Sequence, residues 1–264
     1  MLVTVFRLEM NKGEKNELLF KIYLCFLKRK KNKYTIFGEI NSLGFGEKEY
    51  SALNKEIDFE NLNEEKDLKK LCDELRIEKS SPLSKADVHV NKIGYSIKYM
   101  SAAPPSIINH TTRKGFLRIA TKLDLNISEL DRLIDVYWEL RNSKKITEDC
   151  GNNNKHSPFK KHKEILRPYL EYFCFNGTGS KDSKHPADSV VKFHKFNDPS
   201  TWKIYSKKET VDEIWDGLYF CMRDIGKGGV KDYKNSPDIK KLSPWTRYNT
   251  KKYRGALSVR YKSK

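Results

Sequence analysis

A carboxylate and a lysine stand in one short stretch of this 264-residue chain, at a spacing that suits hydrolysis at a metal ion. The stretch Lys85–Tyr99 reads KADVHVNKIGYSIKY, and eight residues separate Asp87 from the triplet Ser96-Ile97-Lys98. Valines alternate with polar residues before an Asn-Lys-Ile-Gly break, and the alternation resumes after it, so the pattern predicts a hairpin of two short strands. Side chains two apart on a strand point to the same side, which puts Ser96 and Lys98 on one face.

Groups of these kinds on adjacent strands are what metal-dependent cleavage of a phosphodiester needs. An aspartate can hold Mg²⁺ against the phosphate, and a lysine can position or activate water and stabilise the charge that develops. The main-chain carbonyl of Ile97 would then face the metal ion. The string Asp-x8-Ser-x-Lys also fits an ordinary strand pair that carries a surface Asp and Lys, so the residues alone leave both interpretations open.

Several elements of the first half of the chain must position this hairpin. Residues Asn11–Arg29 predict a helix with a broad apolar face, on which Glu14 and Glu17 stand three apart in the first turns. The stretch Lys33–Ile40 has the composition of a strand. Between Lys55 and Lys79, helical spacing runs through Leu68, Leu71, Cys72 and Leu75.

The second half alternates helical and strand patterns. Asn126–Leu140 predicts an amphipathic helix with an Asn or Ser N-cap, and Glu148–Ser157 predicts a polar loop. The remaining expected elements are a helix over Phe159–Phe175 interrupted near Pro168, strands over Ser189–Phe193 and Thr201–Tyr205, and a mixed or helical segment over Val211–Ile225. The sequence has no repeat and no clean linker, which favours one α/β domain over residues 1–264.

The charge balance points to a polyanionic partner. The chain has 52 Lys+Arg against 35 Asp+Glu, a formal net charge of +17. The last 24 residues hold eight of these bases, no acid, and the interleaved aromatics Trp245, Tyr248, Tyr253 and Tyr261. A solvated basic tail would normally lack such aromatics, so we expect an ordered surface that contacts nucleic acid. A basic but otherwise ordinary protein is the alternative.

Other classes of protein are disfavoured by the sequence. It has no apolar run of 18 residues, which disfavours a membrane-spanning helix, and its first residues lack the pattern of a secretory signal. Five cysteines form no C-x-x-C pair. We therefore expect reduced thiols and a cytoplasmic location.

Taken together, the ordered series of stretches resembles the PD-(D/E)xK nucleases, and specifically the type II restriction endonucleases that cut CCGG and GCGC. The resemblance covers nearly the whole chain from Asn11 onward. It rests on Asn11–Ile22 (NKGEKNELLFKI), Lys85–Ile107 with its KADVHV and SIKYMSAAPPSI segments, Thr147–Phe175, His185–Phe193 (HPADSVVKF) and Pro244–Lys262 (PWTRYNTKKYRGALSVRYK). The series is far more specific than any one of its pieces.

The resemblance implies a restriction-endonuclease-like α/β core, a central mixed sheet flanked by helices, in a prokaryotic cytoplasmic enzyme. Residues 1–145 would form the catalytic core, and residues 146–264 a helical region and the DNA-recognition segment. Asp87 matches the metal-binding aspartate, Lys98 the catalytic lysine, and Glu17, with Glu14 as the alternative, the helix carboxylate that approaches the metal. Ser96 takes the place of the second acid, which is a departure from the pattern. The implied metal ligands are Asp87, the Ile97 carbonyl and Glu17, and the implied cofactor is Mg²⁺.

The resemblance also implies a substrate and partners. The substrate would be double-stranded DNA at a short, G/C-containing site of four base pairs, which a cognate DNA methyltransferase would share. The protein would act as a monomer or homodimer. Expected DNA contacts are Ser106 in a recognition loop, Lys227 near the backbone, and Thr246, Arg247, Asn249, Lys251, Lys252, Arg254, Arg260 and Lys262 in the C-terminal segment. A repair or structure-specific nuclease and a non-catalytic DNA-binding protein remain the alternatives.

Overall fold

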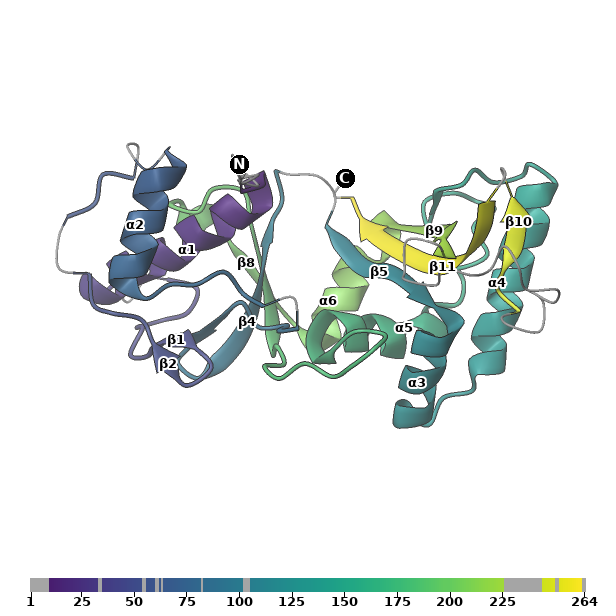
Figure 1. The fold of residues 1–264 in the computed structure, drawn as a ribbon, viewed down its shortest axis with the longest axis horizontal. Helices are drawn as coiled ribbons and strands as arrows, with labels where there is room; N and C mark the ends of the chain where they lie inside the picture. Colours follow the sequence, from purple (N-terminus) through teal and green to yellow (C-terminus); the bar gives the residue numbers. More distant parts are fainter. Residues whose placement is uncertain are drawn as a thin grey trace, which may run out of the picture. The chain divides into compact units, whose positions relative to one another are not determined.

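The computed structural model shows a mixed α/β chain with two sheets and helices packed on them (Figure 1). It describes residues 10–32, 35–53, 56–59, 62, 64–81, 83–101, 105–225, 244–249 and 252–262. The chain divides into two compact units, of which unit 1 comprises residues 1–102 and 187–204 and unit 2 comprises residues 103–186 and 205–264. Each unit is therefore built from two separate stretches of chain.

Unit 1 is built on a six-stranded mixed sheet in the order β2-β1-β3-β4-β7-β8. Neighbours from β2 to β4 pair antiparallel, whereas β4 and β7 run parallel. The sheet is therefore mixed, as predicted. Its strands are β1 (Leu43–Phe45), β2 (Lys48–Glu49), β3 (Val88–Val90), β4 (Ile93–Tyr99), β7 (Ser189–Phe193) and β8 (Lys203–Ser206), and the 3-10 turn η2 (Pro199–Thr201) precedes β8.

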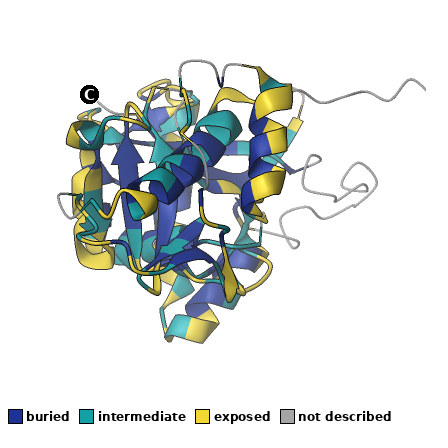
Figure 2. Cartoon of the chain, turned by 90° about the vertical axis from the view of Figure 1, so that its left-hand side faces the viewer, coloured by how far each residue is buried: buried dark blue, intermediate teal, exposed yellow. Residues whose placement is uncertain are grey.

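Two helices complete the core of unit 1. Helix α1 (Lys12–Arg29) begins at the N-cap Asn11, whose side chain accepts from the Glu14 N–H while Glu14 bonds back to the Asn11 N–H. This reciprocal capping box fixes the start of the helix. Helix α2 (Glu65–Leu75) packs beside α1, and its predicted apolar face is buried with the inner residues of α1 and of the strands. Figure 2 shows strands that are largely buried and helices that carry both buried and exposed residues.

The predicted hairpin is present as β3 and β4. Its register pairs Val88 with Tyr95 and Val90 with Ile93. Asn91 and Lys92 form the two-residue turn with φ of 51° and 69°, and a type I′ turn requires positive φ at both positions. Asn91 tolerates this backbone conformation, and its side chain also binds the segment over residues 39–42. Its Oδ1 accepts from the N–H of Asn41 and Ser42 at 2.8 and 3.2 Å, and its Nδ2 donates to the Glu39 carbonyl at 2.8 Å.

Unit 2 contains the second sheet, in the order β10-β11-β9-β6, with β5 also paired to β11. Its elements are β5 (Ser106–Thr112), α3 (Arg113–Leu123), α4 (Ile127–Asn142), β6 (Cys150–Gly151), α5 (Lys163–Glu171), the π turn η1 (Tyr172–Asn176), α6 (Lys207–Ile214), the 3-10 turn η3 (Trp215–Gly217), β9 (Leu218–Asp224), β10 (Arg247–Asn249) and β11 (Lys252–Tyr261). The long strand β11 therefore lies at the centre of this sheet.

Most elements expected from sequence periodicity are present, although α5 runs through Pro168 without a break and β6 lies within the expected loop over Glu148–Ser157. The helix over Asn126–Leu140 is α4, with Asn126 as its N-cap and its predicted apolar face buried. The strand expected over Lys33–Ile40 is wrong, because Thr35–Ile40 forms turns and Gly38 has φ of 66°. Strands β1 and β2 follow instead. None of the five cysteines forms a disulfide bond.

Within the described ranges, no helix has the length and apolar character that would take it across a bilayer.

Replacing Asn91 by Ala should lower the free energy of unfolding by about 2 kcal/mol, because three hydrogen bonds are lost and alanine is strained at positive φ. The Lys92→Gly variant should be as stable as the wild type or up to about 1 kcal/mol more stable, since glycine suits the same turn. Urea denaturation followed by circular dichroism measures both. Equal stability of the two variants would contradict the role given to Asn91.

Candidate active site

The carboxylate of Asp87 is fixed against the backbone of β4. Its Oδ2 accepts from the Ile97 N–H at 2.6 Å and from the Ser96 hydroxyl at 3.3 Å, and the Asp87 N–H donates to the Tyr95 carbonyl at 2.8 Å. Asp87 thus extends the pairing with β4 by one residue before β3 begins at Val88. The hairpin brings the predicted residues Asp87, Ser96 and Ile97 into direct contact.

Glu17 reaches the same place from α1. Its Oε1 accepts from the Ser80 N–H at 3.2 Å and lies 2.9 Å from the Ser80 hydroxyl, which is itself 3.2 Å from the Asp87 carbonyl oxygen. Ser80 therefore connects the helix carboxylate to the strand that carries Asp87. The alternative carboxylate, Glu14, is used elsewhere, because it closes the capping box of α1 and pairs with Lys79.

A lysine that the sequence reasoning missed completes this connection. Lys21 is 0% exposed, and its ammonium donates to Glu17 Oε1 at 2.7 Å, to the Glu78 carbonyl at 2.9 Å and to the Ser80 hydroxyl at 3.0 Å. Glu17 and Lys21 stand four residues apart on α1, where side chains of a helix meet. That spacing, with Phe20 and Ile22 buried on either side, was the available signal.

Lys98 lies on the same face of β4 as Ser96. In the parallel register it stands beside Lys192 of β7, a second buried lysine that sequence reasoning did not single out. Ser96 itself is only 3% exposed. The site therefore combines two carboxylates with several lysines and a neutral hydroxyl, where the usual pattern has a further acid.

The two carboxylates differ in their electrostatic surroundings. Burial raises the pKa of Asp87, against the attraction of the Lys98 ammonium, and the charge of Glu17 adds to the rise. Burial acts in the same direction on Glu17, but the adjacent Lys21 ammonium and the hydrogen bonds from Ser80 lower its pKa overall. The Asp87 charge is thus incompletely compensated by the protein's own groups, which is the condition under which a bound cation stabilises a site.

The donor atoms fit a hard divalent cation such as Mg²⁺. The hydrogen bonds described above use Asp87 Oδ2 and Glu17 Oε1, and no described residue donates to Asp87 Oδ1 or Glu17 Oε2. Mg²⁺ prefers oxygen ligands and is commonly held by one or two carboxylates together with water. Among the described residues, no group of three His, Cys, Asp or Glu side chains could hold a metal ion. The Asp87 and Glu17 carboxylates with the Ile97 carbonyl remain the candidate ligand set.

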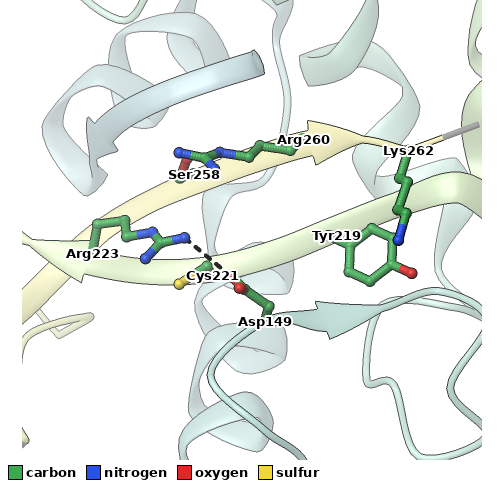
Figure 3. Close-up of a pocket in the computed structure, with 7 residues that line it drawn as sticks. All are labelled: Asp149, Tyr219, Cys221, Arg223, Ser258, Arg260 and Lys262. Carbon is green, nitrogen blue, oxygen red and sulfur yellow. Dashed lines mark hydrogen bonds and ion pairs between the residues drawn. The ribbon is translucent and has the colours of Figure 1, made fainter. Parts of the chain in front are cut away.

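The predicted DNA contacts lie in unit 2, and some of them form an exposed basic face on β11. Arg260 of β11 and Lys262, which directly follows it, line a pocket of about 230 Å³ together with Ser258 of β11 and with Asp149, Tyr219, Cys221 and Arg223 (Figure 3). Ser106, expected in a loop, lies in β5, where it is exposed and pairs in register with Arg260. Asn249 of β10 pairs with Lys252 of β11, and the Lys252 side chain is exposed.

Other predicted contacts are held inside unit 2. Thr246 is 2% exposed, so its side chain lies below the surface. Arg247 donates to Asp135 at 2.8 Å, and Arg254 pairs with Glu148. These guanidinium groups are engaged by carboxylates that stand more than 100 residues away in sequence. Lys227 and Lys251 lie outside the described residues.

Comparison with known proteins adds no relative: no protein-family model, no curated protein and no solved structure matches this chain.

An arginine that pairs with a carboxylate and an exposed arginine should contribute differently to the free energy of unfolding. Arg254→Ala should lower the unfolding free energy by about 2 kcal/mol, because Glu148 loses a partly buried charged partner. Arg260→Ala, which removes an exposed side chain, should change it by less than about 0.5 kcal/mol. Chemical denaturation of both variants measures this, and a larger loss for Arg260→Ala than for Arg254→Ala would contradict the assignment.

Proposed function

We propose that this chain is a Mg²⁺-dependent endonuclease of the restriction type, which hydrolyses phosphodiester bonds of double-stranded DNA at a short, G/C-containing sequence. One observation carries the proposal: Asp87 is fixed against Ser96 and Ile97 on the strand that carries Lys98, and Ser80 connects it to the carboxylate of Glu17. This constellation agrees with what the sequence resemblance implies. The restriction type further implies a DNA methyltransferase that protects the same sequence in the cell.

The residues of the site have separable roles in the proposed reaction. When bound, Mg²⁺ would act as a Lewis acid that stabilises negative charge on the scissile phosphate. Asp87 and Glu17 present the oxygens that would hold it, and the hydrogen bonds from Ile97 and Ser80 set the directions of those oxygens. The Lys98 ammonium stands near Asp87 and would orient a water molecule for in-line attack on phosphorus.

The exposed face of β11 supports duplex DNA as the substrate. Arg260 of β11 and Lys262, which directly follows that strand, stand two residues apart and line the same pocket. An Arg or Lys that donates to guanine O6 and N7 is a common base contact in the major groove, which accommodates a two-stranded β-ribbon. Contacts of basic side chains with phosphates would add affinity that falls steeply with ionic strength.

One observation favours a second candidate, a DNA-binding protein without catalytic activity. Ser96 is neutral and buried, and it stands where the resembled pattern has an acid that binds metal. A site that binds no cation would leave the basic face of β11 as the functional surface. This candidate predicts sequence-specific binding with no cleavage at any divalent-ion concentration.

The variants Asp87→Ala and Lys98→Ala distinguish the two candidates. Each should reduce Mg²⁺-dependent cleavage of a supercoiled plasmid by about 10³-fold or more, because each removes a group that acts at the scissile phosphate. Binding of a DNA duplex, measured by fluorescence anisotropy in Ca²⁺, should remain within a few fold of the wild type.

Matched controls are Asp73→Asn, an exposed acid on α2, and Lys92→Gly on the turn of the same hairpin. Both should cleave at the wild-type rate. Undiminished cleavage by either Asp87→Ala or Lys98→Ala would sink the site assignment.

A further inference from the structure

Lys21 is the most completely buried charged group of the candidate site. Its side chain is 0% exposed, between Phe20 and Ile22 on the inner face of α1. Taking an ammonium out of water is costly unless nearby groups compensate it. Its donors reach Glu17, the Glu78 carbonyl and Ser80 within 3.0 Å, so its hydrogen-bonding capacity of three is fully used.

In each of the two carboxylates, one oxygen accepts the hydrogen bonds from the described residues and the other does not. The Lys21 ammonium donates to Glu17 Oε1, which also accepts from the main chain of Ser80. Asp87 Oδ2 is occupied from the opposite strand by Ile97 and Ser96. Within the described part of the chain, one oxygen of each carboxylate therefore stays without a hydrogen-bond donor, and these two are the oxygens that a cation could take.

The charge of Lys21 acts on both carboxylates. It lowers the pKa of Glu17, with which it makes a direct ion pair, and it also opposes the burial that raises the pKa of Asp87. A divalent cation bound to the same two carboxylates would be attracted by them and repelled by the ammonium. Lys21 and a divalent cation thus compensate the same negative charge.

We propose that Lys21 is a built-in counter-ion of the Glu17–Asp87 pair, which stabilises the pair without metal and limits the site to one weakly held divalent cation. A second divalent cation lacks an anionic ligand, because Ser96 is neutral and its hydroxyl donates to Asp87. Lys21 is in this sense a positioning residue, since it acts through Glu17. The inference rests on the proposed function, because it assumes that the carboxylate pair is a cation site.

The test compares Mn²⁺ binding by the wild type and by Lys21→Met, which keeps most of the side-chain volume and removes the charge. Electron paramagnetic resonance of free Mn²⁺ gives the dissociation constant and the stoichiometry, and thermal unfolding with and without Mn²⁺ gives an independent readout. The wild type should bind one Mn²⁺, and Asp87→Asn should lose it. Lys21→Met should bind Mn²⁺ about tenfold more tightly or better, and should gain more in melting temperature from Mn²⁺ than the wild type does.

A matched control separates charge from hydrogen bonding. Ser80→Ala removes the hydroxyl that Lys21 contacts but leaves the ammonium in place, so its affinity for Mn²⁺ should not increase. If Lys21→Met does not fold, the double variant Glu17→Gln/Lys21→Met decides the question. It should fold without metal, because neither uncompensated charge remains, whereas a double variant as unstable as the single one would assign Lys21 to packing alone.

The outcomes separate this inference from the proposed function. Unchanged or weaker Mn²⁺ binding by Lys21→Met overturns the counter-ion role and leaves the nuclease proposal standing. Two Mn²⁺ ions bound at Asp87-dependent sites in the wild type overturn the limit to one cation. A wild type that binds no Mn²⁺ at millimolar concentration removes the cation site, and both proposals fail together.

Discussion

The candidate site depends on the ion pair between Lys21 and Glu17, because the Lys21 ammonium compensates the negative charge of carboxylates that burial removes from water. Like charges that share a buried site repel each other, and one of them takes up a proton unless a cation is present. The Lys21 ammonium of α1 is such a cation. It donates to Glu17 and to the Ser80 hydroxyl, and that hydroxyl also contacts the main-chain carbonyl of Asp87.

The hairpin adds the second constraint. Its tight turn sets the register, and the register decides that Ser96 and Ile97, rather than their neighbours, meet the Asp87 side chain. A slip of one residue would turn Lys98 to the opposite face of the sheet. The turn residues therefore contribute to the chemistry of the site although they lie outside it.

Local patterns in the sequence were sufficient for α1, α4, β7 and the β3–β4 hairpin, since each has clear periodicity and turn residues. They failed over Lys33–Ile40, where β-prone residues form turns at Gly38. The local patterns also did not predict that Lys21 is buried. A lysine on a helix is ordinarily solvated, and the groups that accept its hydrogen bonds at residues 78 and 80 come from a distant segment. Local sequence patterns also did not show that each unit is built from two separate stretches of chain.

The fold shows that only part of the net charge of +17 is available to a polyanionic partner. Arg247 and Arg254, which looked available for DNA, are neutralised by acids from distant parts of unit 2. Arg260 of β11 and Lys262, which directly follows the strand, stay exposed. The bases that could read DNA are thus fewer than the sequence suggests, and the tertiary fold selects them by giving the others a carboxylate partner.

The proposed function requires that the Asp87–Lys98–Glu17 constellation cuts DNA at a defined sequence. Digestion of a sequenced plasmid by the wild-type protein in Mg²⁺, with the ends of the fragments mapped by sequencing, shows whether it does. We expect discrete fragments whose ends share one short sequence, and no fragments when the divalent ion is chelated. Intact plasmid at every divalent-ion concentration, or ends scattered without a common sequence, would contradict it.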